Sequence, residues 1–572
     1  MTERKPVYIV CDNIISPLGA TTAENIECIY QGIAGHRYAM PAMTQYNLTE
    51  STAIQSILSA LQTTSLDLSK KENLLILSTT KGNIAGLSGK IPPEKEVYLG
   101  YTAQRIADYF MMKNKPVVVS NACVSGVTAL HTASRLLEAG IIENIVVTGI
   151  DFATPFVVSG FESFQSISPE PCRPFDARRN GLSIGGGVGT IVLTNNQKNL
   201  TGTKEIRILG GATTNDANHI SGPSRTGDGL SLAIENALKY TGVDRSEIDF
   251  INLHGTATVF NDDMESKALR LSQLSDVPVN GLKGYFGHTL GASGVIETIV
   301  CIESLRNQIL YGTKGFETLG TSEPLNVVKE HRKAELHTVM KTASGFGGFN
   351  SAIILTDKSK EDVSNCRTAS LRKRSSKQSG PHFCLFSKNT YTIRNNQIKR
   401  NETILFETDR DLSFHDFIRS AFKNLPIDYP KFYKMDDFCK LGFVAFEYLR
   451  KEIPDCEICD KSKIALVFCT STSSLDTDLK HRQSIADPKR YFPAPAVFVY
   501  TLPNILLGEI AIKNKIQGET LCFVNENPDM NRIITYLQLL FDTTDTEIAV
   551  FGIIDFLLDD YEVTISYVKR KY

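Results

Sequence analysis

The sequence lacks an excess of charge of either sign. Among its 572 residues, 61 Lys and Arg are balanced by 63 Asp and Glu, which gives a formal net charge of -2 at pH 7. Nucleic-acid-binding domains usually carry a strongly basic surface, so this balance gives no indication of nucleic acid as a partner. Hydrophobic residues at 42% and charged residues at 22% are typical of an ordinary soluble globular protein.

Long hydrophobic runs are also missing. The first residues, MTERKPVYIVCDNIISPLG, contain neither a cleavable signal architecture nor a stretch of ~18 apolar residues that could span a bilayer. We therefore expect a cytoplasmic protein with no membrane partner.

Cysteine is present without a framework. The 12 Cys are scattered along the chain, which favours free thiols in a reducing compartment over a set of disulfides. Cys456 and Cys459 form a CxxC pair, but no second CxxC and no His pair accompanies it. We interpret them as two ordinary cysteines, with a metal or redox motif as the alternative.

The texture of the chain indicates two globular regions. Residues 7–355 alternate short β-branched runs with longer amphipathic segments and glycine, a pattern typical of a layered α/β protein. Residues 357–381 are charged, rich in Ser and almost without large apolar side chains, and therefore predict a linker. A second region follows over 382–572, with helices expected at 434–450 and 530–541 and strands at 464–468 and 548–554.

Cys123 lies where a strand is expected to meet a helix. Residues 117–120 form a short buried-strand run, and residues 124–139 show helical periodicity that ends at Gly140. A thiol at a helix N-terminus sees the positive end of the macrodipole and unpaired N–H groups, which favour the thiolate. This position suits a nucleophile, although a small packed Cys is the alternative.

Five segments in chain order resemble one enzyme family. The run Asn121-Ala122-Cys123-Val124-Ser125-Gly126 resembles the active-cysteine turn of β-ketoacyl-acyl-carrier-protein synthases, the elongating ketosynthases of the thiolase superfamily. The other matching segments are Arg173-Pro174-Phe175-Asp176 with the glycine cluster 185–189, His254-Gly255-Thr256-Ala257-Thr258, Gly287-His288-Thr289-Leu290-Gly291-Ala292-Ser293-Gly294, and Gly345-Phe346-Gly347-Gly348-Phe349-Asn350. The resemblance covers residues 7–355.

This resemblance implies decarboxylative condensation. Cys123 would carry an acyl thioester, and neutral His254 and His288 would each donate an Nε–H to the malonyl thioester carbonyl. The backbone N–H groups of Cys123 and Phe346 would hold the second oxyanion. The paired histidines match the Cys-His-His elongating class, which takes its donor from an acyl carrier protein.

The supporting residues follow from the same resemblance. In similar proteins the Lys that matches Lys283 pairs with carboxylates that match Glu265 and Glu297, and Asp262 lies in the same segment as Glu265. Such a cluster would fix the charge states around the imidazoles; the alternatives are ion pairs that only position loops, and direct proton transfer by the lysine.

Glycines allow close backbone approach in the last matching segment. They are Gly345, Gly347 and Gly348, and they flank Phe346. We interpret Phe346 as a gate over Cys123, with a static core aromatic as the alternative.

The second region repeats part of the first. Residues 145–151 match residues 548–555, Tyr101-Thr102 matches Tyr500-Thr501, and residues 113–115 match residues 513–515. Counting from the first match places the counterpart of Cys123 near Glu526, within 524–527, where no thiol is present. The region is similar to a truncated synthase half of the silent partner type called a chain-length factor. It would form a pseudo-dimer within the chain or a homodimer across chains, or be a folding remnant.

The expected architecture is therefore a thiolase-like layered α/β/α/β/α catalytic domain over 1–356, the linker 357–381, and a partial thiolase-like domain over 382–572 that resembles a degenerate ketosynthase N-terminal half. No bound cofactor or metal is implied, because the substrates would arrive on the phosphopantetheine of an acyl carrier protein.

The match has departures. Gly186 stands where the family usually has Glu, and Thr342-Ala343-Ser344 replaces Asn-Ser-Phe. They support the alternative that the chain is a non-catalytic, chain-length-factor-like partner of another ketosynthase. A coenzyme A thiolase is a third interpretation.

Overall fold

The computed structural model describes residues 4–35, 47–201, 204–358, 384–453 and 460–570. The expected linker, apart from its first two residues, and the Cys456–Cys459 pair lie outside this range. Within it, no helix combines the length and the apolar character needed to cross a membrane.

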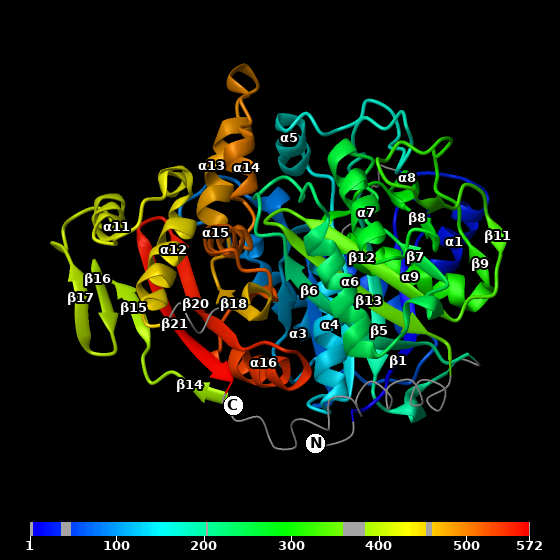
Figure 1. Cartoon of the computed structure of the whole chain (residues 1–572), viewed down its shortest axis with the longest axis horizontal. Helices are drawn as coiled ribbons and strands as arrows, with labels where there is room; N and C mark the ends of the chain where they lie inside the picture. The colour runs from blue at the N-terminus through cyan, green and yellow to red at the C-terminus, as the bar shows by residue number, and fades with distance from the viewer. Residues whose placement is uncertain (1–3, 36–46, 202–203, 359–383, 454–459, 571–572) are drawn as a thin grey trace.

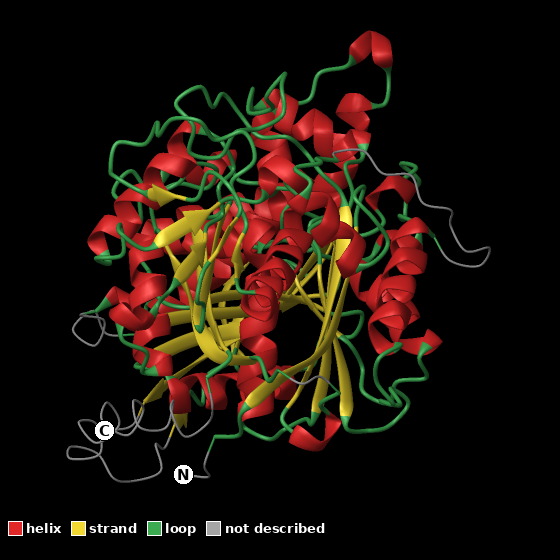
Figure 2. Cartoon of the chain, turned by 90° about the vertical axis from the view of Figure 1, so that its right-hand side faces the viewer, coloured by secondary structure: helices red, strands yellow, loops and turns green. Residues whose placement is uncertain are grey.

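The first region contains two sheets that enclose a pair of central helices (Figure 2). The first sheet has the order β3 (Val117–Val119), β2 (Asn73–Ser78), β4 (Asn144–Asp151), β5 (Gly187–Thr194), β1 (Val7–Ile15), and the second has the order β6 (Arg207–Asn215), β13 (Phe349–Thr356), β12 (Thr338–Gly345), β7 (Phe250–Asn252), β8 (Pro278–Asn280), β10 (Asn326–Val327). Strand β1 also pairs with β6 and so joins the two sheets. Most of these strands are buried along their whole length, as expected for a sheet covered on both faces.

Helices complete five layers. Between the sheets lie α4 (Ser125–Glu138) and α9 (Ser293–Asn307), which contact β4 and β6, and β5 and β12, respectively. The outer helices and short elements are α1 (Thr22–Tyr30), α2 (Leu48–Leu61), α3 (Leu99–Tyr109), α5 (Pro155–Ser163), α6 (Asp228–Thr241), α7 (Val259–Leu271), α8 (Lys283–Phe286), β9 (Ile309–Leu310) and β11 (Arg332–Lys333). Helix α2 packs on β1 and β5, and α6 packs on β6 and β13. The predicted α/β/α/β/α order is confirmed.

A contact between two glycines sets the spacing of the central helices. A Cβ added at Gly126 would lie 2.8 Å from the Gly294 Cα and 2.7 Å from the Val295 backbone N, so neither helix accepts a side chain at this crossing. Both glycines lie in the first turn of their helices. The N-terminal ends of α4 and α9 are therefore held side by side.

The second region lies beside the first, in yellow to red in Figure 1. Its elements are β14 (Cys384–Phe386), β15 (Tyr391–Arg394), β16 (Gln397–Arg400), β17 (Thr403–Glu407), α11 (Phe414–Lys423), α12 (Asp437–Arg450), β18 (Ile464–Thr470), α13 (Leu475–Ile485), α14 (Pro495–Val499), α15 (Ile505–Asn514), β19 (Thr520–Val524), α16 (Met530–Thr543), β20 (Ile548–Leu557) and β21 (Asp560–Arg570). The two helices and two strands expected from the sequence are confirmed. The helix expected from 434 begins at Asp437, after a 3₁₀ turn over Pro430–Lys434.

Strand pairing in this region follows that of the first sheet. Strand β18 lies between β19 and β20 in parallel, and β21 runs antiparallel to β20, as β2 lies between β3 and β4 and β5 runs antiparallel to β4. The Asp151 carboxylate accepts hydrogen bonds from the three residues after β2, and the Asp555 carboxylate accepts them from residues 470–472 at the end of β18. Asp151 and Asp555 therefore close equivalent turns, one in each region.

This register refines the counterpart of Cys123. Ser78 pairs with Val119 and Gly149, and its counterpart Cys469 pairs with Phe523 and Ile553. Carried forward, the register places Asn527 at the position of Cys123, inside the segment expected from the sequence and again without a thiol.

The helical part of the sequence match is wrong by about one turn. Helices α3 and α15 are each followed by a left-handed residue, Met111 with φ 53° and Lys515 with φ 57°, and this pair keeps the strand register. Tyr101 therefore does not correspond to Tyr500, nor residues 113–115 to 513–515. The two matches depart from this register by five and four residues, because Tyr500 precedes α15 whereas Tyr101 lies within α3, and residues 113–115 follow α3 whereas residues 513–514 end α15.

The two regions share a continuous sheet and buried ion pairs. Strand β3 pairs antiparallel with β19, and the Asn121 side chain bonds to the backbone of Thr520 and Cys522. Arg135 on α4 donates to both carboxylate oxygens of Glu519, at 2.8 Å and 3.1 Å, and both side chains are buried. The second region therefore supplies the hydrogen-bond and ion-pair partners of buried polar side chains in the first region.

We expect Glu519→Gln to lower the free energy of unfolding by about 3–5 kcal/mol, because it leaves the buried Arg135 guanidinium without its counter-charge. The urea midpoint should fall while the slope of the transition is unchanged. Glu547→Gln is the matched control, because Glu547 pairs with a part-exposed Lys463 and should change stability by less than about 1 kcal/mol. Equal midpoints for the two variants would refute this account of the junction.

Candidate active site

Cys123 lies in a 3₁₀ turn, Ala122–Val124, between β3 and α4. The preceding Ala122 has φ 49°, a left-handed conformation that is strained for a residue with a Cβ. The Cys123 side chain lies beside the His288 ring, and the residue is 8% exposed. The strand-to-helix junction expected from the sequence is confirmed.

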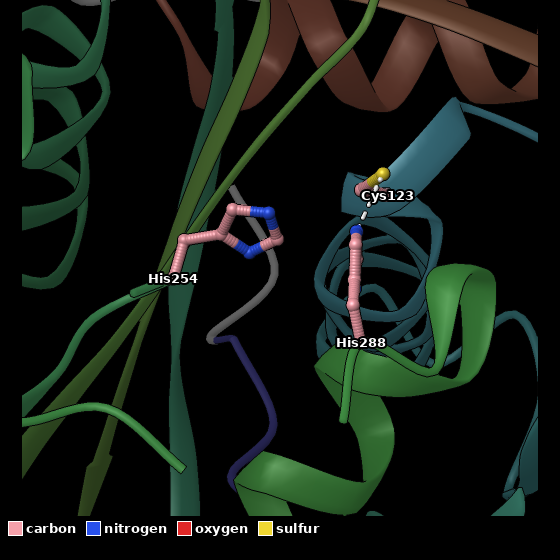
Figure 3. A group of neighbouring side chains, drawn as sticks. All are labelled: Cys123, His254 and His288. Atoms are coloured by element: carbon pink, nitrogen blue, oxygen red, sulfur yellow. Dashed lines mark hydrogen bonds between the residues drawn. The ribbon is translucent and has the colours of Figure 1, made fainter. Parts of the chain in front are cut away.

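His288 precedes α9 as Cys123 precedes α4. Leu290, in the 3₁₀ turn before α9, has φ 52°, so the two helices begin with similar strained turns. The His288 Nε2 lies 3.0 Å from the Cys123 Sγ (Figure 3). Its Nδ1 lies 3.1 Å from the Ser293 Oγ, and a hydroxyl can donate there and leave the Nε2–H facing the sulfur.

His254 enters the site from the opposite side, after β7 (Figure 3). Its ring centroid lies 5.1 Å from that of His288, at an interplanar angle of 85°. The Lys283 Nζ lies 3.2 Å from the His254 Nδ1 and also bonds to the His254 carbonyl oxygen. An ammonium is only a donor, so this contact makes Nδ1 an acceptor and leaves the proton of the neutral ring on Nε2.

The three side chains converge on one small space. The Cys123 sulfur and one ring nitrogen each of His254 and His288 lie within 4.8 Å of one another. All three residues are buried. The sequence-predicted catalytic residues are thus brought together from three loops that are far apart in the chain.

Burial keeps both imidazoles neutral. It lowers the pKa of His254 and of His288 well below the usual 6.5, and the charge of the nearby Lys283 lowers both further. At neutral pH each ring is therefore an N–H donor and carries no charge, as expected for two groups that polarise a carbonyl oxygen.

The Cys123 sulfur does not meet the expectation of a thiolate, because the same burial disfavours its charged form. Loss of solvent raises the pKa of the Cys123 thiol to about 12, although the charge of Lys283 opposes this shift. With nothing else bound, the resting group is a thiol. The helix N-terminus alone does not compensate for the lost hydration.

A buried chain of charges supports His254. Lys283 pairs with Glu297 on α9 at 2.8 Å, and the second oxygen of Glu297 bonds to the Lys341 ammonium from β12. All three side chains are almost inaccessible to solvent. The pairing of Lys283 with Glu297 expected from the sequence is confirmed.

Glu265 has a different role from the one expected. Across the described ranges no ion pair joins it to Lys283; its carboxylate accepts instead from the backbone N–H groups of His254 and Gly255, at 2.6 Å and 2.8 Å. Burial raises the pKa of Glu265 to about 7. Glu265 fixes the loop that carries His254, because its position on α7 directs its carboxylate at the backbone of that loop rather than at Lys283 on α8.

Asp262 holds the same loop from its other end. It accepts from the backbone N–H groups of Phe175 and Ala257, at 2.7 Å and 3.1 Å, and burial raises its pKa to about 6. The matching segments at 173–176 and 254–258 are thereby tied to one carboxylate.

The glycine-rich segment covers Cys123. A Cβ added at Gly345 would lie 3.1 Å from the Cys123 backbone N, and Gly347 and Gly348 have φ 89° and 78°. The Phe346 ring lies 6.0 Å from the ring of Phe161. The segment therefore packs closely against the backbone of Cys123, as its glycines predict.

Sequence reasoning missed two residues of the site. Lys341 is a charged residue inside the apolar strand β12, and that contrast is the signal that could have identified it. Ser293 lies in a matching segment but was given no role there, because its contact with His288 depends on the turn before α9.

Comparison with known proteins agrees with this arrangement. Residues 42–199 match the model of the β-ketoacyl synthase N-terminal domain, and residues 206–317 match that of the β-ketoacyl synthase C-terminal domain. Cys123 lies in the stretch that matches the first model, and the two histidines lie in the stretch that matches the second.

Curated relatives show the same similarity over part of their length. A 3-oxoacyl-[acyl-carrier-protein] synthase 2 of Coxiella burnetii is 28% identical over 258 residues, which are 43% of this chain and 62% of the relative. One of Rhizobium meliloti is 32% identical over 251 residues, 41% of this chain and 59% of the relative. The chain thus spans less than two thirds of the relatives it matches.

Solved structures share the fold. A structure described as "PfaC Keto synthase-Chain length factor" covers 99% of this chain and 78% of its own, with a TM-score of 0.74 and 14% identity. "The ishigamide ketosynthase/chain length factor" covers 62% of this chain and 100% of its own, with a TM-score of 0.57 and 23% identity. These likenesses concern the fold alone.

We expect His254 and His288 to remain neutral as the pH is lowered from about 8 to about 5.5, because burial and the charge of Lys283 lower their pKa. Nitrogen-15 NMR of labelled histidine measures this and should find His254 protonated on Nε2. In Lys283→Met the pKa of His254 should rise, since one cause of its depression is removed. The internal control is the half-exposed His337, whose pKa is raised by its bond to Asp357 and should be the same in both proteins. Protonation of His254 between about pH 6 and 7 in the unsubstituted protein would contradict the described electrostatics.

Proposed function

We propose that this chain is a β-ketoacyl-acyl-carrier-protein synthase, an acyltransferase that condenses an acyl group on Cys123 with a malonyl group on a carrier protein in fatty acid, polyketide or polyene synthesis. The observation that carries the proposal is the convergence of one thiol and two neutral imidazoles within 4.8 Å. The match of residues 42–199 and 206–317 to the two synthase domains supports it.

The first step is transfer of the acyl group. The Cys123 sulfur attacks the thioester carbonyl, a new C–S bond forms, and the bond to the carrier's pantetheine sulfur breaks. The proton of the Cys123 thiol leaves as the new bond forms, and the departing pantetheine thiolate takes up one proton. In the neutral tautomer that donates its Nδ1–H to the Ser293 Oγ, His288 has a bare Nε2, 3.0 Å from the sulfur, that can take the thiol proton and return it to the pantetheine sulfur. The N–H groups at the start of α4 and of the glycine-rich segment are placed for the oxyanion.

The second step forms the carbon–carbon bond. The malonyl carboxylate leaves as carbon dioxide, and its electron pair remains on the thioester as an enolate. The Nε2–H groups of His254 and His288 stabilise the enolate oxygen. The enolate carbon attacks the acyl carbonyl, the bond to the Cys123 sulfur breaks, and the departing thiolate takes up one proton from water. Lys283, with Glu297, acts by fixing the His254 tautomer rather than by proton transfer.

The division of the chain is also a proposal. Residues 1–356 would be the catalytic domain, 357–381 a linker, and 382–572 a degenerate synthase half similar to a chain-length factor. The repeated strand order, the matched turns closed by Asp151 and Asp555, and the absence of a thiol at Asn527 support this division. The antiparallel pairing of β3 with β19 supports a pseudo-dimer within one chain over a homodimer through this surface.

Partners and location follow from this chemistry. An acyl carrier protein would deliver both substrates on its phosphopantetheine arm, and no other cofactor is required by the steps above. A structure described as a type II polyketide acyl-carrier protein in complex with its ketosynthase supports this partner class. Free buried thiols, such as Cys11 and Cys301, support a reducing, cytoplasmic location.

The second candidate, a non-catalytic partner of another ketosynthase, is favoured by Gly186 and Ser344 alone. Ser344 donates to the Asn350 side chain at 2.7 Å and so belongs to the support of the glycine-rich segment. Since the thiol and both imidazoles are in place, the catalytic function is the better supported of the two.

Incubation with a carrier protein that is loaded with an acyl group should increase the mass of the peptide that contains Cys123 by the mass of that group. The reason is that the Cys123 sulfur is the proposed acceptor. Mass spectrometry of the intact and digested protein measures it. Cys123→Ser should give no thioester, and Cys301→Ser, which changes another buried thiol, should react like the unsubstituted protein. An unmodified Cys123 under conditions that acylate a known synthase would favour the non-catalytic partner.

His254→Ala should load the acyl group but condense it about 10²–10³-fold more slowly, since it removes one oxyanion donor. Product formation from malonyl-carrier protein by the preloaded enzyme measures this effect. His337→Ala is a matched control away from Cys123. Unchanged condensation in His254→Ala would remove the proposed role of this residue.

A further inference from the structure

The glycine-rich segment that covers Cys123 also contacts the second region. A Cβ added at Gly508 on α15 would lie 2.9 Å from the Gly347 Cα and 2.9 Å from the Gly347 carbonyl oxygen. One added at Gly347 would lie 3.0 Å from the Asn504 Nδ2. The segment that packs against the Cys123 backbone is therefore also packed directly against the start of α15.

One hydrogen bond joins these two parts at the aromatic residue. The Asn504 Nδ2 donates to the Phe346 carbonyl oxygen at 2.9 Å. The neighbouring carbonyl groups are held from the first half instead: the Asn215 side chain donates to Gly347 at 2.9 Å, and the Asp216 backbone N–H donates to Gly348 at 2.6 Å.

The contribution of Asn504 to stability does not explain why an amide lies at this position. It is buried, and its Oδ1 has no hydrogen-bond partner in the part of the chain that the structure describes. Leaving a buried acceptor unsatisfied costs free energy, so a residue kept in this position requires an explanation. Its contact with the Phe346 carbonyl supplies one.

The internal repeat gives a comparison within the molecule. In the register of the strands and of the left-handed residues after α3 and α15, Asn504 corresponds to Gly100. Gly100 has no side chain and packs against the backbone of Asn525 and Glu526, where an added Cβ would clash. The donor is therefore present only on the side that faces the active sulfur.

The second region also contacts the Phe346 side chain indirectly. The Phe498 ring from the second region lies 6.4 Å from the ring of Phe164, and Phe164 lies 5.5 Å from Phe346. A Cβ added at Gly160 would lie 2.2 Å from the Phe498 ring, so α5 accommodates this ring only because of that glycine. The Phe346 backbone is thus bonded to the second region directly, whereas its ring is separated from Phe498 by the ring of Phe164.

We infer that Asn504 is a positioning residue that holds the Phe346 segment closed over Cys123, so that the second region controls access to the sulfur. This inference deepens the proposed function: the degenerate half would regulate the site by the hydrogen bond from Asn504 to the Phe346 carbonyl. It assigns Phe346 the role of a gate rather than that of a static core aromatic.

The test measures the accessibility of the sulfur and requires no ketosynthase activity. Iodoacetamide alkylates a buried thiol only when the covering segment opens, and mass spectrometry gives the rate at each cysteine of the full chain. Asn504→Ala should increase the rate at Cys123 about fivefold, the change expected for the loss of one neutral hydrogen bond. Asn504→Asp has nearly the same shape but no donor, and should increase the rate at least as much if Asn504→Ala does not fold.

Two controls separate a gate from general loosening. Asn514→Ala lies in the same helix, where Asn514 donates to Glu447 and to the Ile510 carbonyl, and it should leave the Cys123 rate unchanged. The rate at Cys301, buried within α9, should be unchanged in every variant. Equal Cys123 rates in the unsubstituted protein and both Asn504 variants, or a parallel increase at Cys301, would overturn the inference. An absent acyl adduct would refute the proposed function without affecting this result.

Discussion

The site depends on the close approach of Gly126 and Gly294. Because neither residue has a side chain, α4 and α9 cross with their first turns in contact, and the strained turns before the two helices place Cys123 and His288 3.0 Å apart. Two segments separated by more than a hundred residues thereby form one pair of reacting groups. A larger residue at either glycine would separate the helices and, with them, the sulfur from the imidazole.

Burial around this pair then determines the electrostatics. The low-dielectric surroundings disfavour every charge, so the thiol and both imidazoles are neutral at rest. The Glu297 carboxylate pairs with two ammonium groups, those of Lys283 and Lys341, so the cluster carries one more positive than negative charge, and Lys283 contacts the His254 ring. The result is a set of oriented donors that need little rearrangement when negative charge develops on a substrate oxygen.

Local motifs were sufficient to predict the layered fold and the convergence of Cys123, His254 and His288, because each lies in a short segment whose glycines and apolar periodicity constrain its conformation. Contacts between segments were not predictable in the same way. Glu265 was expected beside Lys283 but accepts from the backbone N–H groups of His254 and Gly255. Lys341 was missed because nothing in β12 alone reveals Glu297 opposite it. The matches of Tyr101-Thr102 and of residues 113–115 were misaligned because identities of two or three residues do not reveal where the helices begin and end.

The central claim is that acyl-Cys123 and the two histidines act in one cavity. It is tested most directly by a single turnover in which purified acyl-enzyme is mixed with malonyl-carrier protein labelled in its free carboxylate. The account predicts one labelled carbon dioxide and one β-ketoacyl-carrier protein for each acyl group lost from Cys123. An acyl-enzyme that stays loaded, or that releases carbon dioxide without forming the new carbon–carbon bond, would contradict it.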